Sequence, residues 1–211
     1  MRSEAVGGAA STLISQYYAD MVEQRAPKHL FHLTEASNLD SIRTEGLLST
    51  QTLLERSGAD PETQSRVRGW RAKPIRLPDG VLIGDQWCQP PERLRLCLTD
   101  GLQPQDWYDR LNSFAYLWPS ERAAVRHANT YRGRDQMLLV FDGQALLQTN
   151  APRAYVTTFN VGYAFRRPKL RNMSAFKPWA EWRGAPGRIK EVLVENGVPD
   201  AAVHLMEVRR V

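Results

Sequence analysis

Apolar residues along this chain fall into two kinds of run, and these predict its helices and strands. Where apolar side chains recur every three to four residues, the pattern predicts a helix that buries one face. Short runs rich in β-branched and aromatic residues predict strands. The expected helices cover residues 11–25, 37–45, 50–56, 61–68, 91–98, 105–112 and 120–131. The expected strands cover residues 29–34, 82–86, 114–118, 137–141, 155–159, 191–194 and 204–208.

Several boundaries follow from local signals. Ser37 and Ser120 are expected as N-caps, because a serine hydroxyl can accept a hydrogen bond from an amide of the first turn. Gly46 is expected just after a helix end, where glycine readily takes the left-handed conformation. Residues 166–188 are polar and rich in proline and glycine, which predicts a long loop of the kind that is usually functional or disordered.

The order of these elements favours an α+β fold. Strands and helices mix without regular βαβ alternation, which predicts a mixed or antiparallel sheet. The 211 residues, 42% of them hydrophobic, are enough for one core, so we expect a single domain over residues 28–211 with a helix of residues 1–27 packed on it. The sequence has no long apolar run and no signal-peptide pattern, so we expect a cytoplasmic protein without a membrane span.

The two cysteines and the overall charge exclude little by themselves. Cys88 and Cys97 have neither the spacing nor the histidine partners of a zinc site, so two reduced thiols and no metal are expected. A net charge of +5 is only mildly basic for a chain of this size.

Positive charge is concentrated in two segments. Between residues 165 and 190, eight basic residues stand against one acid, Glu181, and aromatic residues are interleaved with them. The aromatic residues are Phe165, Phe176, Trp179 and Trp182. Residues 66–76 hold five basic residues and no acid. Cations suit phosphates and indoles suit base stacking, so the longer segment favours a nucleic-acid partner. The alternative is a solvated basic loop whose tryptophans fill the core.

Polar and aromatic residues inside three of the expected strands are the candidates for chemistry. His32 and Thr34 share one face of their strand because side chains alternate along it. Tyr116 offers a ring for stacking. Glu191 would be costly to bury unless it were paired or lined a cleft, where it could stabilise positive charge on a reacting sugar. The alternatives are that Glu191 faces solvent on an edge strand and that His32 is a satisfied core or edge residue.

Three segments resemble the DarT-type bacterial nucleic-acid ADP-ribosyltransferases, toxins related in fold to poly(ADP-ribose) polymerases. The opening segment comprises residues 32–34 (HLT), 38–42 (NLDSI) and 45–48 (EGLL). The middle strand is similar to residues 115–119 (AYLWP), and the strand with the catalytic glutamate is similar to residues 191–199 (EVLVENGVP). These segments stand in the family's order and span nearly the whole chain.

This resemblance implies a split ADP-ribosyltransferase sheet and NAD as the substrate, without a metal. By the same resemblance His32, Thr34, Asn38 and Tyr116 contact NAD, while Glu191, His32 and Tyr116 serve catalysis. The acceptor is implied to be DNA or RNA, bound by the loop before Glu191. The residues expected to bind it are Arg166, Arg167, Lys169, Arg171, Trp179 and Trp182. A toxin or phage-defence role and an antitoxin partner would follow as well.

The chain also departs from the family pattern. Ser120 follows Pro119 where an arginine is expected, and the arginine that would clamp the NAD pyrophosphate is left open among Arg56, Arg66 and Arg68. Two alternatives therefore stay open. One is a transferase of this fold that acts on protein, on a small molecule or on an RNA 2′-phosphate. The other is a non-catalytic module that binds nucleic acid or nucleotide.

Overall fold

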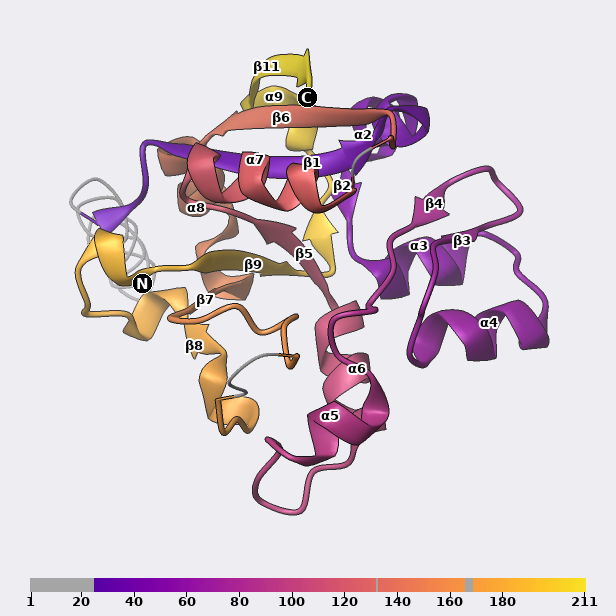
Figure 1. Cartoon of the computed structure of the whole chain (residues 1–211). Coiled ribbons are helices and arrows are strands. Elements are labelled where there is room, and N and C mark those ends of the chain that lie inside the picture. The colour runs from indigo at the N-terminus through magenta and orange to yellow at the C-terminus, as the bar shows by residue number, and fades with distance from the viewer. Residues whose placement is uncertain (1–24, 132, 166–168) are drawn as a thin grey trace, which may run out of the picture.

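The computed structural model describes residues 25–131, 133–165 and 169–211, and Figure 1 shows their arrangement. Helices mix with antiparallel strand pairs, which confirms the α+β class. The helix expected over residues 11–25 lies outside the described residues except for its last one.

The described residues form the following secondary-structure elements. The strands are β1 (His29–Glu35), β2 (Leu47–Leu48), β3 (Ile75–Arg76), β4 (Leu82–Ile83), β5 (Phe114–Leu117), β6 (Gln136–Asp142), β7 (Ala154–Thr157), β8 (Lys177–Pro178), β9 (Glu191–Glu195), β10 (Gly197–Val198) and β11 (Leu205–Arg210). The helices are α2 (Leu39–Glu45), α3 (Thr50–Arg56), α4 (Pro61–Arg68), α5 (Pro91–Arg95), α6 (Pro104–Asn112), α7 (Glu121–Ala128), α8 (Gly143–Asn150) and α9 (Ala201–His204).

Two antiparallel sheets form the centre of the molecule. One has the strand order β1-β6-β11 and the other the order β5-β9-β7-β8. They meet at Phe31 of β1 and Trp118 just after β5, whose backbones exchange hydrogen bonds of 2.9 and 2.8 Å. Within the described residues this bridge is the one pairing between the two sheets, so the sheet is split. Away from the bridge, β1 and β5 diverge (Figure 1).

Side-chain alternation divides the four-stranded sheet between two cores. Val192 and Val194 of β9 face the three-stranded sheet and pack with Phe141 of β6. Leu193 points the other way and packs with the residues of α5 and α6, among them Trp107. Glu191 lies two residues before Leu193 and therefore shares its face. The alternation thus keeps the carboxylate out of the apolar layer between the sheets.

Two outlying groups of elements flank the sheets. Helix α7 packs on the three-stranded sheet, where Ala124 contacts the side chains of Phe31 and Leu138. The segment with α3, α4, β3 and β4 has its own small cluster, which includes Leu54 and Val67. This segment stands beside the two sheets in Figure 1 and closes one side of a cavity.

Some boundary predictions are confirmed. Helices α3 and α4 have the predicted bounds, and the Ser120 hydroxyl accepts a 3.4 Å hydrogen bond from the Ala123 amide at the start of α7. Gly46 follows α2 with a φ of 99°, and a Cβ there would lie 2.5 Å from the backbone of Pro199, so only glycine fits.

Others are wrong. Ser37 caps no helix, because the chain leaves β1 directly into a 3₁₀ turn, Ala36–Asn38, that contains it. Helix α8 was not predicted, although Asp142 caps it by accepting 3.0 Å hydrogen bonds from two amides of its first turn. The strand expected over residues 82–86 shrinks to Leu82–Ile83, since the chain beyond turns to line the cavity.

Candidate active site

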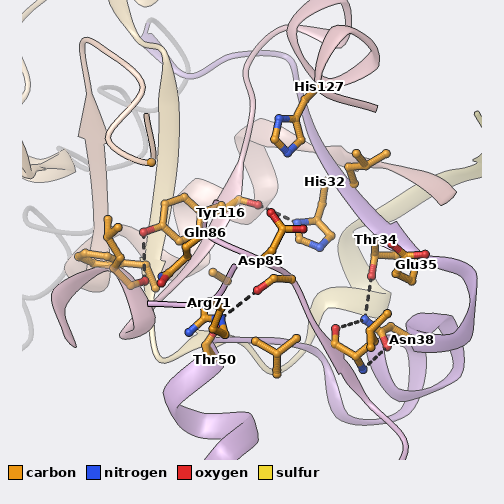
Figure 2. A pocket seen from close by; sticks show the side chains of 18 of the residues that line it. His32, Thr34, Glu35, Asn38, Thr50, Arg71, Asp85, Gln86, Tyr116 and His127 are labelled. Atoms are coloured by element: carbon orange, nitrogen blue, oxygen red, sulfur yellow. Dashed lines mark hydrogen bonds between the residues drawn. The ribbon is translucent and has the colours of Figure 1, made fainter. Parts of the chain in front are cut away.

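A cavity of about 530 Å³ lies where β1 and β5 part, and Figure 2 shows its lining. Its volume is within the range of small-molecule sites. The cavity brings together five residues that the sequence singled out from three strands and the turn after β1: His32, Thr34, Asn38, Tyr116 and Glu191. Residues 81–89 complete its walls together with His127, Thr130, Tyr131 and Arg134.

His32 is held at the split between the sheets. Its Nδ1 lies 2.8 Å from the carbonyl oxygen of Tyr116, and since a carbonyl can only accept, Nδ1 carries the proton. Burial lowers the pKa of His32 to about 4, although the bond to Tyr116 works in the opposite direction. The ring is therefore neutral at neutral pH. Its Nε2 has no partner among the described residues and can accept a hydrogen bond from a ligand hydroxyl.

Glu191 is buried, with 4% of its surface exposed, on a central strand, so the solvent-facing edge-strand alternative is wrong. Its Oε2 accepts hydrogen bonds from the Thr157 hydroxyl at 2.9 Å and the Val161 amide at 3.0 Å. Burial raises its pKa to about 7 against these two bonds and the charge of Arg171. Its Oε1 has no hydrogen bond within the described residues and is left for a ligand.

Tyr116 forms the wall between His32 and Glu191. Its hydroxyl donates a 3.0 Å hydrogen bond to the Leu111 carbonyl, which fixes the ring. Burial, with the nearby Glu191 carboxylate as the next cause, raises the pKa of Tyr116 well above its ordinary value. The phenol is therefore neutral and held in place, which suits a stacking or positioning role rather than proton transfer.

Arg71 is a cavity residue that the sequence analysis did not select. Its guanidinium is buried and donates hydrogen bonds to the carbonyls of Gly84 and Val67 and to Oδ1 of Asn112. Burial lowers its pKa to about 10, so it is charged at neutral pH. All three partners are neutral, and no carboxylate in the described part of the chain forms an ion pair with it. A buried cation without a counterion favours an anionic ligand.

Arg56, Arg66 and Arg68 lie elsewhere. None of the three lines the cavity, and Arg56 is paired at 3.9 Å with Glu45 on the surface. Arg66 and Arg68 are exposed on α4. The only hint of Arg71 in the sequence is its place in the acid-free basic segment of residues 66–76, and nothing in that segment separates it from its neighbours.

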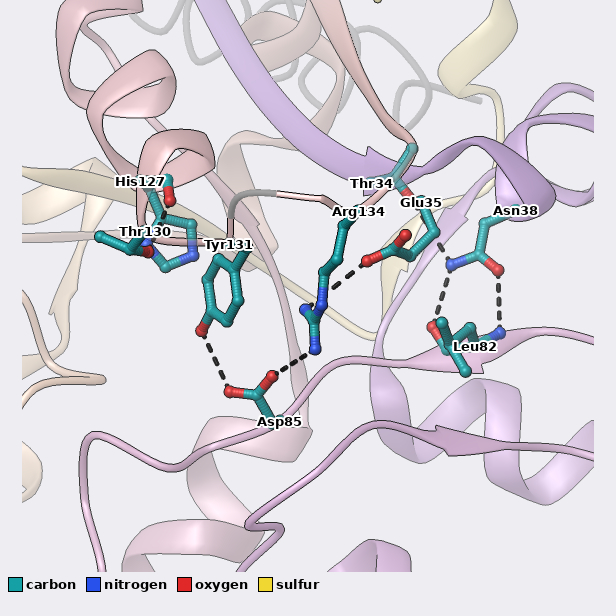
Figure 3. A network of polar contacts seen from close by, with 9 residues as sticks. All are labelled: Thr34, Glu35, Asn38, Leu82, Asp85, His127, Thr130, Tyr131 and Arg134. Atoms are coloured by element: carbon teal, nitrogen blue, oxygen red, sulfur yellow. Dashed lines mark hydrogen bonds and ion pairs between the residues drawn. The ribbon is translucent and has the colours of Figure 1, made fainter. Parts of the chain in front are cut away.

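Asn38 and Thr34 join β1 to the opposite wall (Figure 3). The Asn38 amide donates to the Leu82 carbonyl at 2.9 Å and accepts from the Leu82 amide at 2.8 Å, as a neighbouring strand would. It also donates to the Thr34 hydroxyl at 3.3 Å. Asn38 therefore fixes the position of β4, while Thr34 keeps its hydroxyl proton for another acceptor.

A second network of polar side chains, centred on Asp85, lines the cavity near His127 (Figure 3). Asp85 accepts hydrogen bonds from the Tyr131 hydroxyl at 3.0 Å and from Arg134 at 2.8 Å. Arg134 also pairs with Glu35 at the end of β1, with 3.5 Å between the charged atoms. These contacts connect the segment after β4 to the segment after α7, so they hold two walls at a fixed separation.

Neither cysteine is prepared for nucleophilic chemistry. Both are free, and burial raises the pKa of Cys88, which lines the cavity, to about 11. The described residues contain no cluster of three or more His, Cys, Asp or Glu that could hold a metal ion. In the same residues no helix is long and apolar enough to cross a membrane.

The basic loop before Glu191 differs from what the sequence suggested. Arg166 and Arg167 lie outside the described residues, and Lys169 is exposed. Arg171 is 4% exposed, and its guanidinium donates to the carbonyls of Val161, Tyr163 and Lys169 at 3.0 to 3.1 Å. These bonds leave it inside the loop instead of on an acceptor surface.

The two tryptophans of this loop are also turned inward. Trp179 is 1% exposed in the core between the two sheets, and Trp182 packs against that core. This arrangement agrees with the alternative that the tryptophans fill the core. The burial of Trp179 and Arg171, and the packing of the partly buried Trp182 against the core, argue against the acceptor role expected for them.

A different aromatic pair lies at the cavity. Trp87 lines it, and its ring centroid is 5.9 Å from that of Phe165 at an interplanar angle of 57°. Both side chains are 42% exposed, and the guanidinium of Arg93 stands 5.6 Å from the Phe165 ring centroid. An exposed aromatic pair with a cation beside it can stack on a planar group.

Comparisons with known proteins place the sequence in a family. Among solved structures, the chain is similar to that of Thermus sp. 2.9 DarT in complex with ADP-ribosylated ssDNA, at 16% sequence identity and a TM-score of 0.34, over 82% of this chain and 77% of that one. No curated protein matches the sequence. The model of a family of unknown function, DUF7002, matches residues 28–205. The chain therefore belongs to the DUF7002 family.

Proposed function

We propose that this protein cleaves NAD between nicotinamide and ribose and transfers the ADP-ribosyl group to a nucleic-acid base. The observation that carries the proposal is the convergence of His32, Tyr116 and Glu191, from three strands of a split sheet, on one cavity that also holds the unpaired cation Arg71. The resemblance of the same three strands to DarT-type transferases supports it.

The cavity offers a matching group for each part of NAD. Arg71 would hold the pyrophosphate, because a guanidinium pairs with phosphate oxygens in a bidentate way. His32 would accept a hydrogen bond from a ribose hydroxyl at its free Nε2. Tyr116, fixed by its bond to Leu111, would lie against the nicotinamide ring. Thr34 would add a hydroxyl beside His32, and Asn38 would position the wall rather than touch NAD.

Glu191 would supply the electrostatic part of catalysis. When NAD is bound, cleavage of its glycosidic bond sends the bonding electrons to nicotinamide and builds positive charge on the ribose. An ionised Glu191, oriented through Oε2 by Thr157 and Val161, would place Oε1 beside that charge. After the acceptor attacks, the same carboxylate would take up the proton that the acceptor releases. With a pKa of about 7 it can serve both steps near neutral pH.

The acceptor is proposed to be a base exposed from its stack. A base must leave its stack to reach a cavity of this kind, and aromatic side chains can then replace its stacking neighbours. Trp87 and Phe165 are the aromatic pair in position to do so.

The test is transfer from labelled NAD. The purified protein is incubated with NAD labelled in the adenylate and with separate pools of single-stranded DNA, duplex DNA, RNA and protein. Released nicotinamide is measured in parallel. We expect label in one nucleic-acid pool and a matching amount of nicotinamide.

The matched control is Glu191→Gln, which keeps the size and the hydrogen-bond acceptor of the side chain but not its charge. We expect it to bind NAD and transfer no label. Label in the protein pool would overturn the nucleic-acid acceptor. Binding of NAD by the wild type without nicotinamide release would overturn the enzyme and favour a binding module.

A further inference from the structure

A second cavity, of about 370 Å³, lies where the start of α7 faces the segment that leads into β9. Its charged lining consists of Arg122 and Arg126 of α7 and Lys190. The other lining residues are proline, serine, alanine, glycine and isoleucine, so no carboxylate takes part in its wall.

The three cations have nothing to neutralise them. All three residues are exposed, and in the described part of the chain their side chains form no ion pair or hydrogen bond. Glu121, the acid beside Arg122, is already paired with Arg209. Arg122 and Arg126 stand four residues apart on one helix face, where like charges destabilise a helix. Their position therefore costs stability and gives a concave surface with a positive potential that attracts anions.

This cavity shares a wall with the candidate active site. In three pairs of consecutive residues, the first residue named lines the active-site cavity and the second lines the other cavity. These pairs are Trp118 and Pro119, His127 and Arg126, and Glu191 and Lys190. The Cα atoms of consecutive residues are about 3.8 Å apart, so the wall is about one residue thick at each of these points. A polymer bound in the second cavity would therefore lie close to the wall that carries Glu191.

We propose that the second cavity binds the phosphates of the acceptor strand, and this inference rests on the proposed function. Contacts to phosphates, to which arginine and lysine contribute, fix a nucleic acid in position, whereas base contacts specify sequence. A single strand suits the site, because it carries a phosphate at each nucleotide and can bend around the wall toward the active-site cavity. Arg122, Arg126 and Lys190 thus position the strand, and the first cavity receives its base.

The test compares two triple variants that remove equal charge. The site variant combines Arg122→Gln, Arg126→Gln and Lys190→Gln. The control combines Arg43→Gln, Arg95→Gln and Lys28→Gln, three exposed residues that line neither cavity. Binding of a fluorescein-labelled single strand is measured by anisotropy over a range of salt concentrations, together with thermal unfolding of each protein.

We expect the site variant to bind the strand at least about tenfold more weakly than the control at low salt, with a salt dependence smaller by about 2 in its logarithmic slope. Equal affinities for the two variants would overturn the proposal. Equal loss of binding to poly-glutamate and to the strand would also overturn it, since the cavity would then be a site for acidic proteins.

NAD cleavage without an acceptor separates this inference from the proposed function. The site variant should release nicotinamide in water as fast as the wild type, because none of its three residues lines the first cavity. If neither the wild type nor either variant cleaves NAD, and only the site variant loses strand binding, the proposed function is wrong and the phosphate site is supported. If cleavage occurs and both variants bind the strand equally, only the phosphate site fails.

Discussion

Two polar side chains in the wall of the first cavity, His32 and Glu191, keep unused bonding capacity, whereas Arg171 in the loop before β9 uses each nitrogen of its guanidinium within the loop. Glu191 leaves one carboxylate oxygen free, and His32 leaves one ring nitrogen free. Arg171, in contrast, gives its guanidinium to three carbonyls of its own region. A polar side chain in the wall is thus available to a ligand where the fold satisfies only part of it. Arg71 also donates from all three of its nitrogens, and it differs from Arg171 in lining the cavity.

The backbone explains the difference. A strand satisfies its amides and carbonyls through its neighbours, so the side chains on its face are not needed for that purpose. A long loop lacks such partners, and a buried loop carbonyl must find a side chain instead. Arg171 supplies those donors for residues 161, 163 and 169, which is why a basic residue in such a loop says little about an acceptor.

The largest effect is expected from Glu191→Gln. Removing the charge should lower the rate of NAD cleavage about 10²- to 10³-fold, since the carboxylate would stabilise charge that exists only in the transition state. The affinity for NAD should change little. Single-turnover release of nicotinamide and an independent NAD binding measurement check both parts. A rate within a few fold of the wild type would mean that Glu191 only supports the sheet.

The pH dependence should show the same carboxylate. With the pKa of Glu191 at about 7, the rate should rise through neutral pH and fall about a hundredfold by about pH 5, where about one molecule in a hundred is ionised. Thr157→Val removes a hydrogen bond that lowers this pKa, so it should move the profile to higher pH. An unchanged profile in that variant would assign the ionisation to another group.

Stability should show the opposite trend, because the folded-state pKa of Glu191 is raised above its ordinary value of 4.5. The folded protein then binds more protons than the unfolded chain between about pH 4.5 and pH 7, so this group's contribution to the free energy of unfolding falls as the pH rises. Comparison with Glu191→Gln removes the opposing effect of His32, whose pKa is lowered. Denaturant unfolding at several pH values measures the difference.

The sequence predicted the site residues that lie on strands, but it did not predict those that tertiary packing brings to the cavity. Period-two alternation put His32 and Thr34 on one face, and the apolar runs placed Glu191 in a strand, so their meeting in one cavity followed once the strands assembled. Arg71 could not be found this way, because it reaches the cavity only through the packing of α4 against α6. Its partner Asn112 is 41 residues away in the sequence.

The same distinction holds for the fold. Helix α3 and helix α4 carry their own capping signals, Ser49 and Asp60, and the predicted bounds agree with the structure. The split of the sheet is set instead by one backbone bridge between Phe31 and Trp118, 87 positions apart, and no local pattern encodes it. Segment 82–86 is extended in pattern but pairs over only two residues, and beyond them the Asp85 side chain bonds to Tyr131 and Arg134 in the cavity wall.

Arg171→Met tests whether Arg171 stabilises the loop before β9 or binds the acceptor. It should lower the free energy of unfolding by about 1–3 kcal/mol, because buried carbonyls lose their donors. Lys169→Met, at an exposed position of the same loop, should change it by less than about 0.5 kcal/mol. Denaturant unfolding measures both. If Arg171→Met left stability unchanged and abolished strand binding, Arg171 would be an acceptor contact after all.

The smallest effect should come from Trp87→Leu, which tests whether the acceptor's base stacks at the cavity instead of on the loop tryptophans. Losing one stacking partner should weaken acceptor binding by about 1 kcal/mol, roughly fivefold in KM, with the KM for NAD unchanged. Trp70→Leu is the matched control, since Trp70 is similarly exposed but lies outside the cavity lining. Because stacking uses the face of any base, the loss should be similar for strands of different sequence. Equal KM values for the two variants would remove Trp87 from the acceptor site and leave the phosphate contacts to hold the strand.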